Sequence, residues 1–239
     1  MNFDKIYETN FVSLLSGDST ALAKRVLYRG KKSKLADQAK YVHLVLSSFN
    51  EVTSVLENLE YGEIFLGSYS VSSRWRKKYD RNHYIRYHYE FWVINLIRLY
   101  ERLLILIDDV YGLGIPHKEV TYKTISSAIK MEGTDTLKIL KKIHGALSTA
   151  QGLKNEVFHR HTYSDGTLDD ITMYDFLSRQ SNETNEQKKF VWAARLKAQL
   201  YLMGKRREVR KANIEMIGIV LSVLNTLAMP YKKQTHFKD

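Results

Sequence analysis

The sequence contains no cysteine, and only two of its 239 residues are proline. Without thiols, disulfide bonds, thiolate zinc sites and cysteine nucleophiles are excluded. A chain free of cysteine is compatible with the reducing cytoplasm, where we expect this protein to act. The segment MNFDKIYETNF does not have the charged and then apolar pattern of a secretory signal.

Long apolar runs are scarce as well. The longest, from Met216 to Met229, is shorter than the about 20 residues that a helix needs to cross a bilayer. We therefore expect a core helix there, and no contact with a membrane.

Positive charge is in excess, with 37 Lys and Arg against 26 Asp and Glu and a formal net charge of +11. Such an excess attracts polyanions, either nucleic acid or an anionic membrane surface. Because many proteins are merely basic, the charge alone does not choose a partner.

Apolar residues recur at spacings of three and four along most of the chain, which predicts an all-α protein. Pro116 and Pro230 are expected beyond helix ends, and Gly62 is expected to end the first long helix. Thr134 or Asp135 is expected to cap the helix that begins there. The predicted helices span residues 35–60, 80–111, 119–131, 134–159, 168–179 and 186–229.

No internal repeat and no linker divides the sequence. This predicts a single bundle of four to five main helices with extra N-terminal helices. Residues 1–79 are expected to form an N-terminal helical region packed on the bundle, residues 80–230 the bundle itself, and residues 231–239 a C-terminal tail.

The stretch LKNEVFHRH, from Leu153 to His161, places several polar side chains at the end of a predicted helix. Asn155 and His159 are four residues apart and share a helix face. Lys154 and His159 differ by about 140° around the axis, so the lysine joins the pair only through its flexible stem or a local unwinding.

These side chains suit cleavage of RNA. An imidazole exchanges protons near neutral pH, an ammonium group neutralises a phosphate, and an amide orients either of them. They suit attack of a ribose 2′-hydroxyl on its own phosphate, which needs no metal and no cofactor. A solvated helix end, with a histidine favoured by the helix dipole, is the alternative interpretation. His159 and His161 have no nearby third ligand of suitable spacing for a metal.

LKNEVFHRH resembles the motif of the HEPN superfamily of all-helical domains. Lys154 stands at the position of an arginine, Asn155 at the polar position and His159 at the histidine. The aromatic helix from Tyr87 to Gly114 and the segment HRHTYSDGTLDDI are also similar to the surroundings of that motif, and the resemblance covers residues 80–228.

The resemblance implies a metal-independent endoribonuclease in a toxin or antiviral-defence setting. It implies a homodimer in which two copies of the motif face each other, and an antitoxin or defence protein as a further partner. His159 would be the general base or acid, Lys154 would steady the scissile phosphate, and Asn155 would orient one of them. Because lysine lacks the planar fork of arginine, a non-catalytic RNA-binding or protein-interaction module is the second hypothesis.

Further RNA contacts are expected from cations around the motif and in two other segments, RWRKKYDRNHYIRYHYE and KRREVRKAN. Glu90 is expected to orient Lys154 or His159, or to pair with Arg86. The alternative for both segments is a solvated helix surface. The candidate RNA-binding residues are Arg160, His161, Arg74, Arg76, Lys205, Arg206, Arg207 and Arg210.

Overall fold

The computed structural model describes residues 4–29, 35–67, 81–145, 166–180 and 185–236. Within these ranges the chain forms helices joined by turns and contains no strand, which confirms the all-α prediction. The chain divides into two compact units. The first consists of Met1–Glu57, Leu96–Ala150 and Ile214–Asp239, and the second of Asn58–Asn95 and Gln151–Asn213. The predicted division at residues 79 and 230 stays a prediction.

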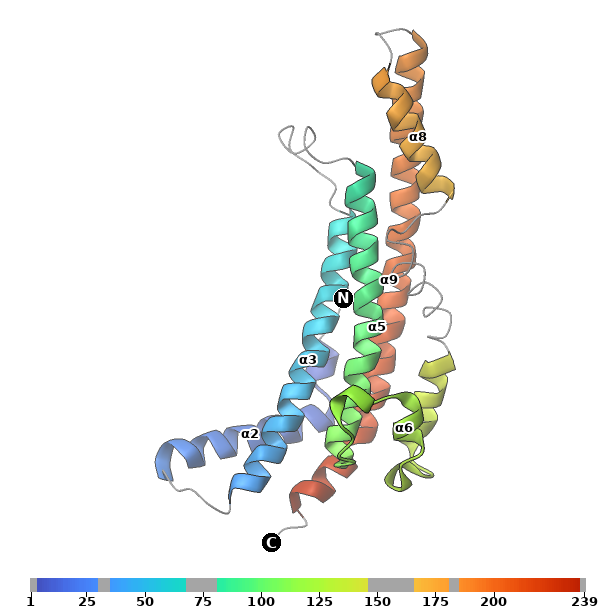
Figure 1. Cartoon of the computed structure of the whole chain (residues 1–239). Helices are drawn as coiled ribbons and strands as arrows, with labels where there is room; N and C mark the ends of the chain where they lie inside the picture. Colours follow the sequence, from blue (N-terminus) through green and yellow to red (C-terminus); the bar gives the residue numbers. More distant parts are fainter. Residues whose placement is uncertain (1–3, 30–34, 68–80, 146–165, 181–184, 237–239) are drawn as a thin grey trace. The chain divides into compact units, whose positions relative to one another are not determined.

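Three long helices contribute to both units: α3 (Leu35–Gly67), α5 (Arg81–Tyr111) and α9 (Asn185–His236) (Figure 1). In the first unit, α1 (Asp4–Tyr7) and α2 (Asn10–Arg29) pack on them through aromatic side chains. The ring of Phe11, which is fully buried, makes edge contacts with Phe49 of α3 and Tyr231 of α9. The hydroxyl of Tyr231 donates to Asp18 of α2 at 2.9 Å.

Buried carboxyl groups organise the end of α5. Leu113 N–H donates to the carbonyl of Asp108, and Ile115 N–H donates to its side chain, so Asp108 holds the turn that follows the helix. Gly112 in this turn has a φ of +56°, a conformation that favours glycine. The neighbouring carboxyl of Asp109 accepts a hydrogen bond from Ser48 of α3. The predicted end of this helix at Tyr111 is therefore confirmed.

A predicted helix over residues 119–131 is wrong. The segment instead forms three short helices: η1 (His117–Glu119), α6 (Tyr122–Ser126) and η2 (Ile129–Met131). Thr121 and Thr124 form a reciprocal capping box that starts α6, and Ala128 has an extended backbone between α6 and η2. Side-chain capping and an extended residue thus interrupt the helical pattern.

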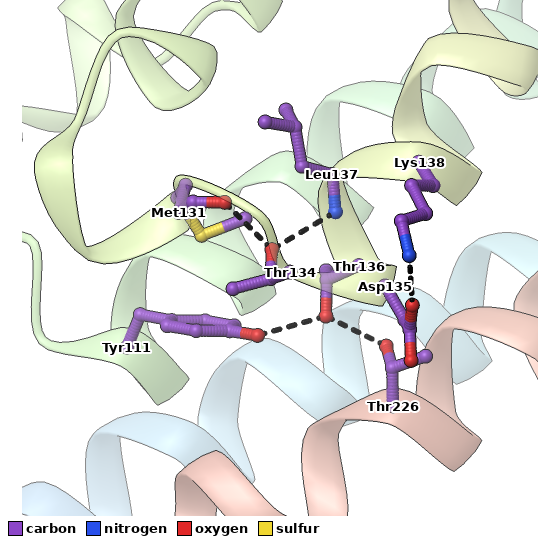
Figure 2. Close-up of polar contacts among 8 residues, drawn as sticks. All are labelled: Tyr111, Met131, Thr134, Asp135, Thr136, Leu137, Lys138 and Thr226. Atoms are coloured by element: carbon purple, nitrogen blue, oxygen red, sulfur yellow. Dashed lines mark hydrogen bonds and ion pairs between the residues drawn. The ribbon is translucent and has the colours of Figure 1, made fainter.

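Residues 135–145 are helical, and the predicted cap at Thr134 is confirmed. Its hydroxyl accepts from Leu137 N–H at 3.2 Å and donates to the carbonyl of Met131 at 2.8 Å (Figure 2). Two residues along, a chain of hydroxyl groups joins Tyr111 of α5, Thr136, and Thr226 of α9, with oxygen separations of 2.9 and 2.8 Å. The two hydrogen bonds of Thr136 fix this helix against α5 and α9.

Two predicted helix ends are wrong because packing outweighs the local signal. α3 continues through Gly62 to Gly67, and the missing side chain of Gly62 makes room for Trp92: a Cβ there would lie 3.1 Å from the Trp92 Cβ. α9 continues through Pro230 to His236, because Tyr231 immediately after the proline is anchored in the core. Pro116, in contrast, follows α5 as predicted and precedes η1.

In the second unit, α8 (Gly166–Gln180) lies against α9 (Figure 1). Its bounds are close to the predicted residues 168–179. The ammonium group of Lys197 on α9 pairs with Asp170 at 3.3 Å and lies over the ring of Tyr174. Asp169 of α8 pairs with Arg86 of α5 at 3.0 Å. α8 is thereby tied to α5 and α9.

By length and composition, α9 is the one described helix that is long and apolar enough to cross a membrane. In its most apolar segment, 39% is buried within the protein. Core helices of soluble proteins often have the same composition. The absence of membrane contact stays a prediction.

Burial of the Asp109 carboxyl raises its pKa above the ordinary value, and the nearby Asp108 raises it further, while the hydrogen bond from Ser48 opposes the shift. A group whose pKa is raised in the folded state loses its stabilising contribution as pH rises from the unfolded value through the folded one. Asp109→Asn should therefore reduce the fall in unfolding free energy as the pH rises above the ordinary aspartate pKa of about 4. Chemical denaturation of both proteins over a pH series that begins below that value measures the difference.

Asp135→Asn is the matched control. The pKa of Asp135 is shifted in the opposite direction, because pairing with Lys138 lowers the pKa of that exposed carboxyl. An Asp109→Asn protein whose stability falls with pH as steeply as the parent's would contradict the burial effect.

Candidate functional site

Most residues of the predicted site lie outside the described residues. These are Lys154, Asn155, His159, Arg160, His161, Arg74 and Arg76. The described members, Glu90, Lys205, Arg206, Arg207 and Arg210, all belong to the second unit. The geometry of this unit therefore shows how the predicted basic segment on α9 is held.

Asn213 is the buried polar centre of the second unit. Its side chain is 1% exposed. Its amide oxygen accepts from the indole N–H of Trp92 at 2.8 Å. Its amide nitrogen donates to the carbonyl of Leu59 and to Glu63 Oε2, both at 3.2 Å. One side chain of α9 thus contacts both α3 and α5 and fixes the rotation of the basic segment about the helix axis.

Two of the four predicted cations on α9 are engaged by carboxylates. Lys205 pairs with Glu208 at 3.0 Å, and its ammonium group lies 4.6 Å from the centre of the Tyr89 ring. The other oxygen of Glu208 accepts from the Tyr89 hydroxyl at 2.9 Å. Arg210 lies 3.8 Å from Glu63 of α3, the same carboxylate that Asn213 contacts. These cations therefore contribute to holding α3, α5 and α9 together.

Arg206 and Arg207 are different. Both are exposed, and no ion pair engages either of them within the described part of the chain. The guanidinium of Arg206 lies against Gly67, where an added Cβ would be 2.6 Å from its central carbon. Among the four predicted cations of α9, Arg206 and Arg207 are therefore the two whose charge is available for a ligand.

Glu90 is half-buried on α5. Its predicted alternative partner, Arg86, pairs with Asp169 of α8. The proposed role of Glu90 in orienting Lys154 or His159 stays a prediction, because both of those residues lie outside the described ranges.

The aromatic residues of the predicted RNA-binding segment divide between two environments. The hydroxyl of Tyr84 donates to the carbonyl of Phe65 at 2.9 Å, and its ring contacts that of His88, whereas Tyr87 is 65% exposed. Desolvation of the half-buried His88 imidazole lowers its pKa. Tyr84 and His88 are thus packing residues, while Tyr87 remains accessible. Trp75 and Tyr79 lie outside the described residues.

Arg195 and Gln199 of α9 were missed by the sequence analysis, although they share the face of Arg206. Residues separated by 4, 7 and 11 positions lie on one side of a helix, and Gln199, Leu202 and Arg206 follow Arg195 at those spacings. This periodicity was the available signal. Among the described residues, no group of three His, Asp or Glu side chains is placed to hold a metal ion.

Comparison with protein families gives a match. The model of the HEPN_Cthe2314-like HEPN family matches residues 68–219, which is more than half of the chain. The matched range contains α5, the LKNEVFHRH stretch, α8 and most of α9. No curated protein and no solved structure matches the chain.

Replacing Asn213 by leucine tests its role in the second unit. Asn213→Leu leaves the buried indole N–H of Trp92 without its acceptor, so we expect a loss of about 2 kcal/mol in the free energy of unfolding. Lys211→Ala, at an exposed position of the same helix, is the control and should change it by less than about 0.5 kcal/mol. Urea denaturation measures both values, and equal stabilities of the two variants would show that the Asn213 contacts are dispensable.

Proposed function

Because the chain belongs to the HEPN_Cthe2314-like HEPN family, we propose that it is a metal-independent endoribonuclease with LKNEVFHRH as its catalytic motif. The observation that carries this proposal is the family match, which includes the motif in the order long helix, motif, α8 and α9. The basic charge of +11 supports RNA as the substrate, because RNA is a polyanion.

The reaction is a transesterification within RNA. The ribose 2′-oxygen forms a bond to the adjacent phosphorus, and the bond from phosphorus to the 5′-oxygen of the next nucleotide breaks. A base accepts the proton of the 2′-hydroxyl, and an acid donates a proton to the leaving 5′-oxygen. His159 takes one of these roles, Lys154 neutralises charge on the phosphate, and Asn155 orients one of them.

A homodimer suits this chemistry. Two facing copies of the motif supply two imidazoles, so one serves as base while the other serves as acid. We propose this assembly together with a cytoplasmic location and a toxin or antiviral-defence role, in which an antitoxin or defence protein restrains the activity.

A non-catalytic module that binds RNA or a protein is the second candidate. Lys154 favours it, because lysine presents a single mobile charge where arginine would donate two parallel hydrogen bonds to a phosphate. This candidate requires that the purified protein binds RNA without cutting it.

His159→Ala should lower the rate of RNA cleavage by roughly 10²- to 10⁴-fold, which is the usual contribution of a positioned acid or base. RNA affinity should change little, because binding depends on many charges. The assay is cleavage of total RNA by the purified protein, and EDTA should not change the rate. His43→Ala, which removes an exposed imidazole of α3, is the control and should cut like the parent. Equal rates for the His159 and His43 variants would exclude a catalytic motif.

Lys154→Arg should keep or raise the cleavage rate, because it restores a forked phosphate donor. Lys154→Ala should lower the rate. The same RNA assay ranks the three proteins. If the alanine variant cuts as fast as the arginine variant, charge at this position plays no part in the reaction.

The homodimer is tested by light scattering after size-exclusion chromatography. At micromolar concentration, we expect twice the chain mass of 27.9 kDa. A single-chain mass over the whole concentration range in which RNA is cut would contradict an active site composed across two copies.

A further inference from the structure

The second unit contains a cavity of about 390 Å³ between the end of α3 and one face of α9. Its apolar lining comes from Leu66, Leu202 and Met203. Its polar lining comes from Gln199 and from two arginines, Arg195 and Arg206. This volume lies in the range of small-molecule sites, which also combine an apolar lining with a few polar groups.

Within the described residues, the charge of the two arginines is not compensated by a carboxylate. No ion pair engages Arg195 or Arg206 within the described part of the chain. The neighbouring cations Lys205 and Arg210, in contrast, are paired with Glu208 and Glu63. The cavity is therefore a local site for anionic groups rather than one part of a uniform basic surface.

Along α9, an apolar side chain and an amide lie between the two positive charges of the cavity. Arg195 and Arg206 are 11 residues apart, which is about 16 Å along the axis at 1.5 Å per residue, and both lie on the same face. Leu202 and Gln199 lie between them. At one end, Gly67 permits the guanidinium of Arg206 to rest against the α3 backbone, which restricts its position.

We propose that this cavity binds one base of single-stranded RNA, with phosphates of the same strand contacted at the two ends of the cavity. The base lies on Leu202 and Met203, and the Gln199 amide bonds its polar edge. Arg195 and Arg206 contact phosphates of that strand at the two ends of the cavity, since a guanidinium matches the geometry of a phosphate. An acidic peptide would use the same two charges but would not need an amide beside an apolar surface.

This inference rests on the proposed function, because it assigns a subsite to the RNA substrate. It differs from the motif at residues 153–161, since it concerns binding alone. A 2′-O-methyl oligonucleotide of about eight residues is the appropriate probe, because it lacks the attacking hydroxyl and stays intact during the measurement. Fluorescence anisotropy over a series of salt concentrations gives both the affinity and its salt dependence.

Arg195→Ala and Arg206→Ala should each flatten the slope of log K against log salt by about 0.7, the value for one lost phosphate contact on a single strand. Arg98→Ala is the matched control. It removes the same charge from an exposed arginine of α5 that lies outside the cavity and has no ion pair in the described chain. Its slope should match the parent's.

Two further variants test the geometry without removing charge. Gly67→Ala places a Cβ where the Arg206 guanidinium lies and should weaken binding severalfold. Gln199→Leu should weaken binding of the base-containing oligonucleotide about tenfold and should leave an abasic oligonucleotide of equal length unaffected. Far-UV circular dichroism confirms that each variant remains helical.

The cavity assignment is overturned if both arginine variants bind like Arg98→Ala, or if Gln199→Leu weakens both oligonucleotides equally. It is also overturned if the parent does not bind the probe at low salt, or if an acidic peptide but not RNA depends on the two arginines. Failure of catalysis is a separate result: a protein that binds in this way but does not cut RNA retains the cavity and loses the proposed reaction.

Discussion

The second unit depends on the hydrogen bonds that the side-chain amide of Asn213 makes. The amide is buried, and a buried amide must have its hydrogen bonds satisfied. Its partners on α3 and α5 permit one rotation of α9 about its axis. That rotation turns Arg210 toward Glu63 and places Arg206 against Gly67. The positions of these charges on α9 therefore follow from the hydrogen bonds of one buried side chain.

Much of the fold could be predicted because the signals are local. The spacing of apolar residues predicted the all-α class and the approximate bounds of α5 and α8, and the hydroxyl of Thr134 marked a helix start. The two wrong helix ends lie where a distant residue outweighs a local preference, whereas the predicted helix over residues 119–131 is interrupted by local capping at Thr121 and Thr124. Gly62 accommodates Trp92 instead of ending α3, and Tyr231 holds α9 in the core past Pro230. Neither contact can be derived from the residues on each side of the glycine or proline.

The candidate site also has a part that local sequence could predict and a part that depends on contacts between distant residues. The motif at Lys154 and His159 is contiguous, so a reaction could be proposed from its residue types and from the family resemblance, and that reaction stays a prediction. The availability of each basic side chain could not be predicted, because Lys205 and Arg206 are neighbours with the same charge and different partners. The cavity was missed for a related reason: Leu66 and Arg195 are far apart in sequence and meet only in the fold.

The central proposal is that RNA is cut by its own 2′-hydroxyl, with an imidazole of the motif moving the proton. A substrate with one 2′-deoxy nucleotide at the cleavage position tests this directly, beside an all-ribose substrate of identical sequence. We expect the all-ribose substrate to give 2′,3′-cyclic phosphate and 5′-hydroxyl ends, and the 2′-deoxy position to resist cleavage. Cleavage at the 2′-deoxy position, or products that carry 5′-phosphate ends, would contradict the proposed reaction.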